Sequence, residues 1–546
     1  MDVHLARPVS RKKKWLIGLA VAAAAGIAGI FITASILAKR FEPYIKEQAA
    51  SYLAKRFDSK VEIGKLIVHI PHIPALQLVM KRGAGVIAEV IGEDIVLRHK
   101  GRTDIEPMFR MKRFRFSADL GRIFDPTKRV ALVYLDEMEI NIPPKGERPS
   151  FKEDKSETDG KATIEAAPAK SNTDGANTGV LIEQVSITSS KLRILPRTKD
   201  RKPLEFDLQD IVLDSVRMSE SLNYRAKLTN PRPPGQIYAN GAFGPWNAES
   251  PSETPLSGDF DFNKADLGVF SAIAGTLQSR GTFTGTLGSV QAKGEATVPD
   301  FRLKMAGNPV HLFTEYEVEV DGTNGNTILK PVHAKLNGTA FTTSGGVIKH
   351  DGDEKRTIDL DVHMPDGEMM DLLRLATKNK PFMSGRIQMD SRIRIPPLSS
   401  KVKEKLLLAG KFSIRHGQFL QDAIQDKVDT LSRRGQGQPT DTSIDNVFSD
   451  MSGEFNMADQ ELTMKNLAFT VPGSKVKLDG TFDMQSDELD FYGALMLDAK
   501  VSQTMSGWKR WALKPVDPFF KKHGAGTYLK IKVVGTAKSP KFGLDR

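Results

Sequence analysis

Apolar and polar residues alternate one by one along much of the chain after Lys60. The alternation is clean over residues 315–321, 358–364, 386–395, 476–484 and 528–533. A period of two places successive side chains on opposite faces of a strand, so each segment predicts a strand with one apolar and one wet face. This pattern is typical of antiparallel sheets, in which glycine, aspartate and asparagine supply the turns. The pattern therefore predicts a mainly β protein with roughly two dozen strands.

The first forty residues follow a different pattern. Residues 15–37 are 23 consecutive residues without a formal charge, and as a helix they would extend for about 34 Å, enough to cross a bilayer. Arg7 and the run from Arg11 to Lys14 make the preceding segment strongly basic. We therefore expect a cytoplasmic arm over 1–14, a transmembrane helix over 15–37 and the remaining chain outside the cytoplasm. The alternative is a cleaved signal peptide, whose apolar core usually has only about 7–15 residues.

Helical periodicity is scarce in the rest of the chain. Residues 41–57 can form an amphipathic helix, either close to the membrane or packed against the body. Further short helices are predicted over 266–274, 368–377 and 419–433. These helices can cover only part of the apolar faces of so many strands. Two arrangements remain open, a sandwich whose sheets cover each other and an open-sided groove that shelters hydrocarbon.

One segment of unusual composition divides the chain into two regions. Between residues 145 and 179 almost all residues are small, polar or charged, which predicts a flexible linker. It separates a membrane-proximal region, 38–144, from a β-rich body, 180–546. A weak repeat of strand, short helix, glycine and strand recurs over 260–286 and 358–389, and such repeats favour an elongated stack.

Neither the charge distribution nor any sequence motif indicates a catalytic, metal or nucleic-acid site. The net charge of +11 is spread along the chain, which favours solvated faces over a nucleic-acid site, and the absence of cysteine removes disulfides and thiolate ligands. No histidine is followed by glutamate, and no Gly-Lys pair is followed by serine or threonine. His69 and His72 would lie on opposite faces of a strand, which disfavours a metal site. The sequence therefore predicts no catalytic residue, no cofactor and no metal.

Several segments resemble the AsmA-like family, whose relatives include TamB and YhdP. The resemblance runs through residues 41–70 and from Phe116-Ser-Ala-Asp-Leu-Gly to Pro144, and it is sharpest in the last ~90 residues. There it covers Leu467-Ala-Phe-Thr-Val-Pro-Gly-Ser-Lys-Val-Lys-Leu-Asp-Gly480, Trp508 to Pro518-Phe519-Phe520, Gly524-Ala-Gly-Thr-Tyr-Leu-Lys-Ile-Lys-Val-Val-Gly535, and Pro540. The resemblance implies a single-pass anchor in the bacterial inner membrane, a cytoplasmic N-terminus and a periplasmic β-sheet curled into a hydrophobic groove. It also implies roles in lipid supply to the outer membrane and in outer-membrane protein assembly, without catalysis.

Two non-enzymatic functions are therefore favoured over an enzymatic one. The first is a lipid-binding or lipid-transfer groove that takes phospholipid or another envelope lipid. The second is an assembly factor for outer-membrane proteins, with outer-membrane or periplasmic proteins as partners. The groove hypothesis assigns its lining to apolar positions near the C-terminus, namely Val476, Leu478, Phe482, Leu489, Phe491, Leu495, Leu529 and Ile531.

Overall fold

A computed structural model describes the chain from residue 47 to 545 with gaps. The described residues are 47, 50, 51, 54, 59–69, 87–99, 101–104, 106–119, 128–142, 180–195, 202–216 and 220–545, without 246, 248, 249, 305, 306, 323, 351, 352, 354, 398–401, 521–525 and 538. The predicted membrane span at 15–37 and the predicted linker at 145–179 lie outside them, as does most of the predicted helix at 41–57. Within the described residues, no helix has the length and apolarity to cross a membrane.

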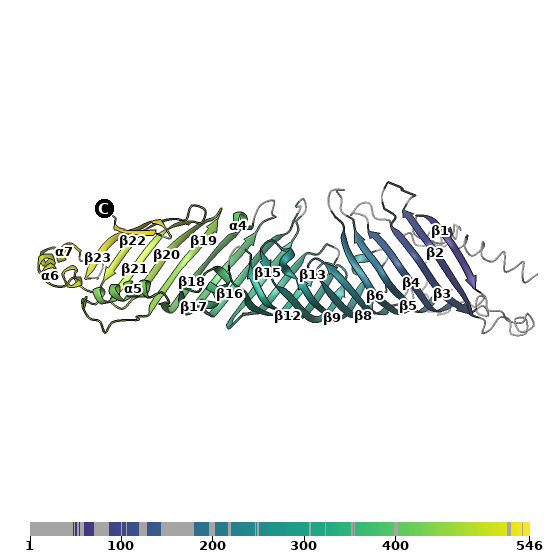
Figure 1. The fold of residues 1–546 in the computed structure, drawn as a ribbon, viewed down its shortest axis with the longest axis horizontal. Coiled ribbons are helices and arrows are strands. Elements are labelled where there is room, and N and C mark those ends of the chain that lie inside the picture. Colours follow the sequence, from purple (N-terminus) through teal and green to yellow (C-terminus); the bar gives the residue numbers. More distant parts are fainter. Residues whose placement is uncertain are drawn as a thin grey trace, which may run out of the picture. The chain divides into compact units, whose positions relative to one another are not determined.

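The described residues form a mainly β fold, as the alternation predicts, with 24 strands and a few short helices. The chain divides into two compact units, the first formed by 1–231 and 239–254 and the second by 232–238 and 255–546. Figure 1 shows the strands of each unit lying side by side in chain order. The predicted boundary at 145–179 falls inside the first unit, between two strands that pair with each other.

The first unit contains the strands before residue 232. They are β1 (Ser59–His69), β2 (Ile87–His99), β3 (Phe109–Asp119), β4 (Lys128–Ile142), β5 (Val180–Ile194), β6 (Leu204–Val216) and β7 (Leu222–Pro231). Each strand pairs with the next, and every pair is antiparallel except β4 with β5, which are parallel from Lys128 opposite Val180 to Ile142 opposite Ile194. The sheet is therefore mostly rather than wholly antiparallel. Alternation cannot foresee this exception, because strand direction depends on where the connection returns the chain.

Strand β8 (Pro234–Phe243) is divided between the units, the 3₁₀ turn η2 (Pro251–Glu253) belongs to the first, and the second unit holds the remaining elements. Its strands are β9 (Pro255–Asp266), β10 (Ile273–Ala274), β11 (Thr276–Thr286), β12 (Ser289–Leu303), β13 (Val310–Val320), β14 (Thr327–Leu336), β15 (Thr339–Ile348), β16 (Thr357–Glu368), β17 (Met383–Ile395), β18 (Leu407–Phe419), β19 (Ser449–Ala458), β20 (Glu461–Val471), β21 (Ser474–Asp483), β22 (Glu488–Leu497), β23 (Thr527–Thr536) and β24 (Ser539–Leu544). Its helical elements are η3 (Leu267–Val269), α3 (Met369–Ala376), α4 (Val402–Lys405), α5 (Asp422–Gly435), η4 (Val501–Thr504), α6 (Trp508–Leu513), η5 (Lys514–Val516) and α7 (Asp517–Phe520). The strand pairings in the described part of this unit are antiparallel, with β9 next to β11 and the later strands following in order.

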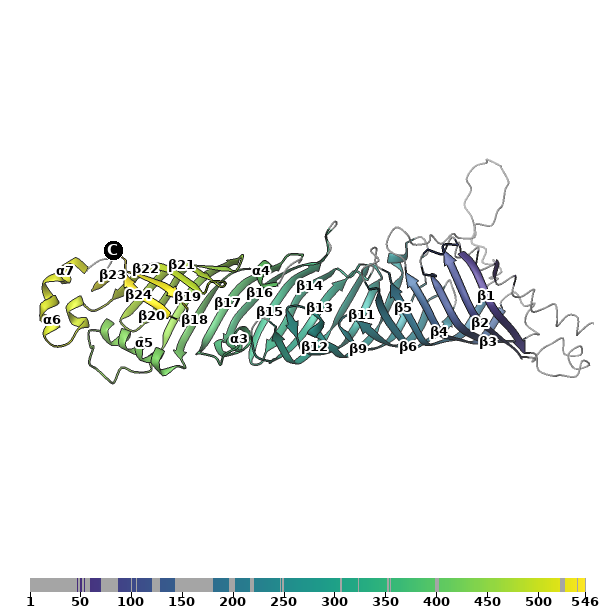
Figure 2. The ribbon, with the colours of Figure 1, turned by 45° about the horizontal axis from the view of Figure 1, so that its top comes forward.

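Register shifts recur through the middle of the second unit. Every pairing from β12 with β13 to β20 with β21 contains one, whereas the last three pairings contain none. Bulges of this kind bend a strand and increase its local twist. The strands of this unit are visibly bent and twisted in Figure 2.

Two of the three short helices predicted in the body are confirmed. Helices α3 and α5 both lie along one edge of the second unit's sheet (Figure 2). The prediction of a helix over 266–274 is wrong, because only the 3₁₀ turn η3 forms there, and Ile273 and Ala274 pair with β12. Asp266 caps the turn through the Gly268 N–H at 2.7 Å, and Gly275 follows with φ +140°, so the chain is held in a turn.

Six buried apolar side chains of the first unit form one cluster. It consists of Ile95, Leu97, Met111, Met138, Val185 and Ile187, each between 3% and 8% exposed. A second cluster in the other unit joins Met364, Met383, Ile387 and Ile414 to Leu373 of α3. In this second cluster a helix supplies part of the cover that an apolar sheet face requires.

Candidate functional site

The eight apolar residues assigned to the groove lie on three neighbouring strands and share one face. In register, Val476 of β21 lies opposite Leu495 of β22, which lies opposite Leu529 of β23. Phe482 lies opposite Leu489 in the same way. Leu478 and Ile531 lie on either side of Gly493, and Phe491 stands two residues before that glycine. Because these registers contain no shift, the alternation holds without interruption and brings all eight side chains together.

Strand β20 extends this face with residues that the alternation did not identify. Leu462 lies opposite Phe482, Leu467 opposite Leu478, and Phe469 opposite Val476. The pairing of β20 with β21 shifts register after Met464, at a bulge that includes Asn466, whose φ is +53°. Apolar residues on this face have even numbers before the bulge and odd numbers after it. The bulge breaks the period of two, which hides the continuity in the sequence. We call the apolar face of β20 to β23 the C-terminal face.

Most side chains of the C-terminal face remain partly accessible. Phe491 is buried, with 7% of its surface exposed, whereas the other seven predicted residues are only half-buried. Gly480 lets the Phe491 ring pack close to β21, since a Cβ at this position would come within 2.8 Å of the ring. The face is therefore apolar, continuous and partly accessible.

Helix α5 packs beside these strands at their ends. The Ser432 hydroxyl donates to the Pro472 carbonyl at 2.9 Å, and the Ser474 hydroxyl donates to the Leu431 carbonyl at 3.0 Å. Pro472 belongs to the turn between β20 and β21, so these bonds attach the helix to the rim of the sheet. Figure 1 shows α5 at that rim, beside the strand ends. The helix thus borders the C-terminal face at the turn.

The reverse side of the same strands is charged and wet. Lys475, Lys477 and Asp479 on β21 are exposed, and Asp490, Tyr492 and Lys530 continue this side on the next two strands. Hydrogen bonding to Asp490 raises the pKa of the Tyr492 hydroxyl above its usual value, because a neighbouring carboxylate disfavours the phenolate. One face of the sheet therefore suits hydrocarbon and the other suits water.

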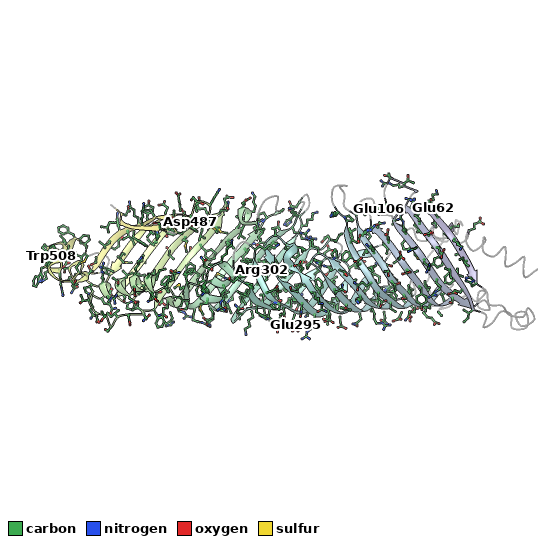
Figure 3. The ribbon with its side chains drawn as sticks, in the orientation of Figure 1. Glu62, Glu106, Glu295, Arg302, Asp487 and Trp508 are labelled. Atoms are coloured by element: carbon green, nitrogen blue, oxygen red, sulfur yellow. The ribbon has the colours of Figure 1, made fainter. Side chains whose placement is uncertain are left out.

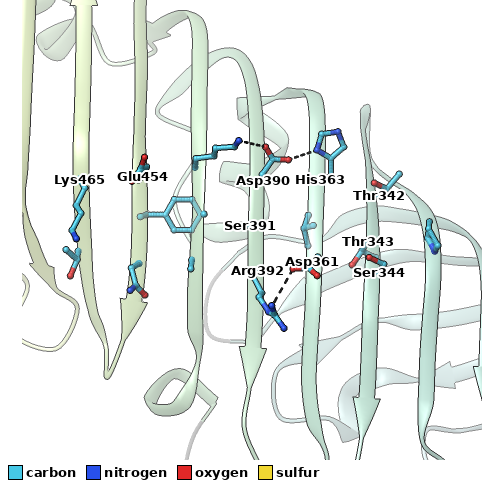
Figure 4. Close-up of a pocket in the computed structure, with 18 residues that line it drawn as sticks. Thr342, Thr343, Ser344, Asp361, His363, Asp390, Ser391, Arg392, Glu454 and Lys465 are labelled. Carbon is cyan, nitrogen blue, oxygen red and sulfur yellow. Dashed lines mark hydrogen bonds and ion pairs between the residues drawn. The ribbon is translucent and has the colours of Figure 1, made fainter.

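A polar pocket of about 870 Å³ lies on the charged side of β14 to β20 (Figure 4). Two rows of paired residues border it, one through Thr342, His363, Asp390, Lys411, Glu454 and Lys465, the other through Ser344, Asp361, Arg392, Ala409, Asn456 and Thr463. Intervening residues, among them Ser391 and Gly410, also line it.

Two acids of this pocket are paired with bases. Asp390 lies 2.5 Å from the His363 Nδ1 and 3.5 Å from the Lys411 ammonium, and Asp361 lies 4.0 Å from the Arg392 Nε, which also binds Asp359 at 2.8 Å outside the pocket lining. The His363 hydrogen bond lowers the pKa of Asp390, and the Arg392 hydrogen bond lowers the pKa of Asp359. Both lowered pKa values follow from ion pairs between neighbouring strands. Such pairs stabilise a sheet, so the pKa shifts are explained without a catalytic role.

The described residues contain no group of three or more histidine, aspartate or glutamate side chains arranged to hold a metal. Of the histidine pair considered from the sequence, His69 is exposed on β1 and His72 lies outside the described residues. No family model, no curated protein and no solved structure matches the chain.

Proposed function

We propose that this chain is a membrane-anchored lipid-binding or lipid-transfer protein of the AsmA-like type, and that the C-terminal face contacts acyl chains. The observation that carries the proposal is a continuous apolar face in which seven of the eight predicted residues are only half-buried. Soluble monomers rarely expose large continuous apolar patches, and such patches usually mark binding sites. Each Å² of apolar surface that an occupant removes from water is worth about 25 cal/mol.

Acyl chains suit this face better than a polar ligand. Its side chains are leucine, isoleucine, valine and phenylalanine, which offer no hydrogen-bonding group. A polar ligand there would lose its bonds to water without replacement. The face runs across four paired strands, so it offers a path rather than a single enclosed cavity.

The proposed location rests on the uncharged run at 15–37 and its basic flank. The chain would cross the bacterial inner membrane once, with its N-terminus in the cytoplasm and its bulk in the periplasm, and would support phospholipid supply to the outer membrane. Protease added to spheroplasts should then digest the part after Lys39 and spare the N-terminal arm. A body protected until the membrane is lysed would contradict this topology.

Mass spectrometry of lipids that copurify with the full chain tests the binding proposal. Native protein should carry phospholipid, and Leu478→Asp or Ile531→Asp should lose most of it while strand circular dichroism stays unchanged. Lys477→Asp is the matched control, because it changes charge one residue away on the wet side. Equal lipid content in Leu478→Asp and Lys477→Asp would contradict the proposal.

An assembly factor for outer-membrane proteins is the second candidate, and the edge strand β24 favours it. This strand pairs with β23, its residues are exposed, and Phe542 is 74% exposed. An exposed edge can add a strand from a partner protein. Native protein that copurifies without lipid would favour this candidate over the first.

A further inference from the structure

A compact helical segment projects beyond β22 in the second unit. After η4 the chain forms α6, η5 and α7 in succession before it returns to the sheet as β23. Gly507 begins the segment with φ +66°, and prolines at 515 and 518 divide it into short pieces. Figure 3 places Trp508 at the outer end of this segment, away from the strands.

The segment presents aromatic side chains to solvent. Trp508 is 75% exposed, Trp511 is 70% exposed and Phe519 is 85% exposed. Leu513, Val516 and Phe520 are half-buried, so the segment has its own apolar contacts with the protein and leaves the larger rings outside. In the described part of the chain, no other stretch of this length exposes three aromatic side chains to this degree. Among the described residues, these three rings therefore stay largely outside the packed structure.

The outward charges of the same segment are all positive. Lys509, Arg510 and Lys514 are exposed, and the Lys514 ammonium lies 3.9 Å from the centre of the Trp511 ring. The one acid, Asp517, accepts hydrogen bonds from the Ser502 backbone N–H and hydroxyl, each at 2.8 Å. Ser502 is only 3% exposed, so this acid is turned toward the protein and holds the segment in place. The outer surface therefore combines exposed aromatic rings with cations.

We propose that this segment docks onto an anionic phospholipid bilayer. Trp508, Trp511 and Phe519 would enter the headgroup region, where aromatic rings are favoured, and the three cations would contact lipid phosphates. The core of a protein interface favours aromatic residues but is depleted of lysine, whereas a bilayer surface accommodates both together. The proposal is independent of acyl-chain binding at the C-terminal face.

Flotation with vesicles tests this docking. Full-length protein in phosphatidylcholine nanodiscs is mixed with vesicles of phosphatidylcholine alone or with added phosphatidylglycerol. Native protein should float with the anionic vesicles and bind neutral vesicles at least about tenfold more weakly, since each basic residue near the surface contributes about fivefold. Lys509→Glu with Arg510→Glu should abolish the preference for anionic vesicles.

The aromatic contribution is tested with matched variants. Replacing Trp508, Trp511 and Phe519 together by alanine should weaken flotation at least about tenfold, because their burial in the interface is lost. Replacing the two tryptophans by phenylalanine should preserve most of the binding. Phe448→Ala is the control, because Phe448 is also exposed, at 56%, but lies outside the segment.

Tryptophan fluorescence measures whether the aromatic rings enter the bilayer. In a Trp15→Phe and Trp246→Phe background only Trp508 and Trp511 remain, and vesicle lipids with brominated chains should quench them. Four results would each overturn the proposal: no flotation of native protein, equal flotation with neutral vesicles, unchanged flotation of the triple alanine variant, or flotation without quenching. Copurified lipid, measured on the same preparations, should be unaffected by the triple variant, which separates this test from that of the proposed function.

Discussion

The apolar cluster of β2 to β5 and the C-terminal face of β20 to β23 arise from the same alternating pattern but differ in burial. Six residues of the first cluster are 3–8% exposed, with phenylalanine, isoleucine and other apolar residues of β1, β3, β4 and β6 packed against them. On the C-terminal face only Phe491, of the eight predicted residues, is buried. Alternation thus produces an apolar face in both regions, and the surroundings of that face decide whether it is buried or partly accessible.

The largest expected effect is the response of the two faces to a charge. Ile95→Asp places an unpaired carboxylate in the buried cluster and should lower the free energy of unfolding by at least about 4 kcal/mol. Leu478→Asp can keep its carboxylate hydrated and should cost about 1 kcal/mol or less. Guanidinium unfolding followed by circular dichroism measures both. Similar losses in the two variants would show that the C-terminal face is a packed core.

A smaller effect concerns the attachment of α5 beside the C-terminal face. Asp429 is 4% exposed and accepts from the Gln425 amide at 2.8 Å and from the Asn446 and Val447 backbone N–H groups at 2.9 and 3.0 Å. Asp429→Ala leaves these buried donors unsatisfied and should cost about 2–3 kcal/mol. Asp426→Ala, an exposed position on the same helix, should have almost no effect. Thermal unfolding compares the pair, and equal shifts would refute the anchoring role of Asp429.

The bulge in β20 should have a moderate effect. Asn466 has φ +53°, and its backbone N–H donates to the Asp479 carboxylate at 2.6 Å. A β-branched residue is strained in this conformation, so Asn466→Val should lower the free energy of unfolding by about 1–2 kcal/mol. Asn466→Gly should be nearly neutral. If both variants unfolded like native protein, the bulge would not be required to align Leu467 with the C-terminal face.

The smallest effect is a pH dependence in the first unit. Hydrogen bonds from Lys191 and Arg193, each 2.7 Å long, lower the pKa of Glu205 below its ordinary value of 4.5. The resulting stability is present above pH 4.5 and is lost as the pH falls through the lowered pKa, because the unfolded chain binds the proton first. Glu205→Gln should therefore destabilise by less than about 1 kcal/mol at pH 7, since the pair is partly exposed. Unfolding titrations should show this difference disappear in acid, and a difference that grew there would contradict the assignment.

The sequence by itself determined the mainly β class, the approximate number of strands and the positions of two short helices. It also placed Val476, Leu495 and Leu529 on one face, because those strands pair without a register shift. These features follow from local periodicity and turn-forming residues, which act over a few neighbours.

The tertiary structure decided what depends on residues far apart in the chain. It set the parallel pairing of β4 with β5, added Leu467 and Phe469 to the C-terminal face through a bulge, and replaced the helix expected over 266–274 by a turn and a short strand. It also decided that Ile95 is buried while Leu478 stays partly accessible, and that Trp508 faces solvent. Register, strand direction and burial are set by long-range partners, and a period of two contains no information about them.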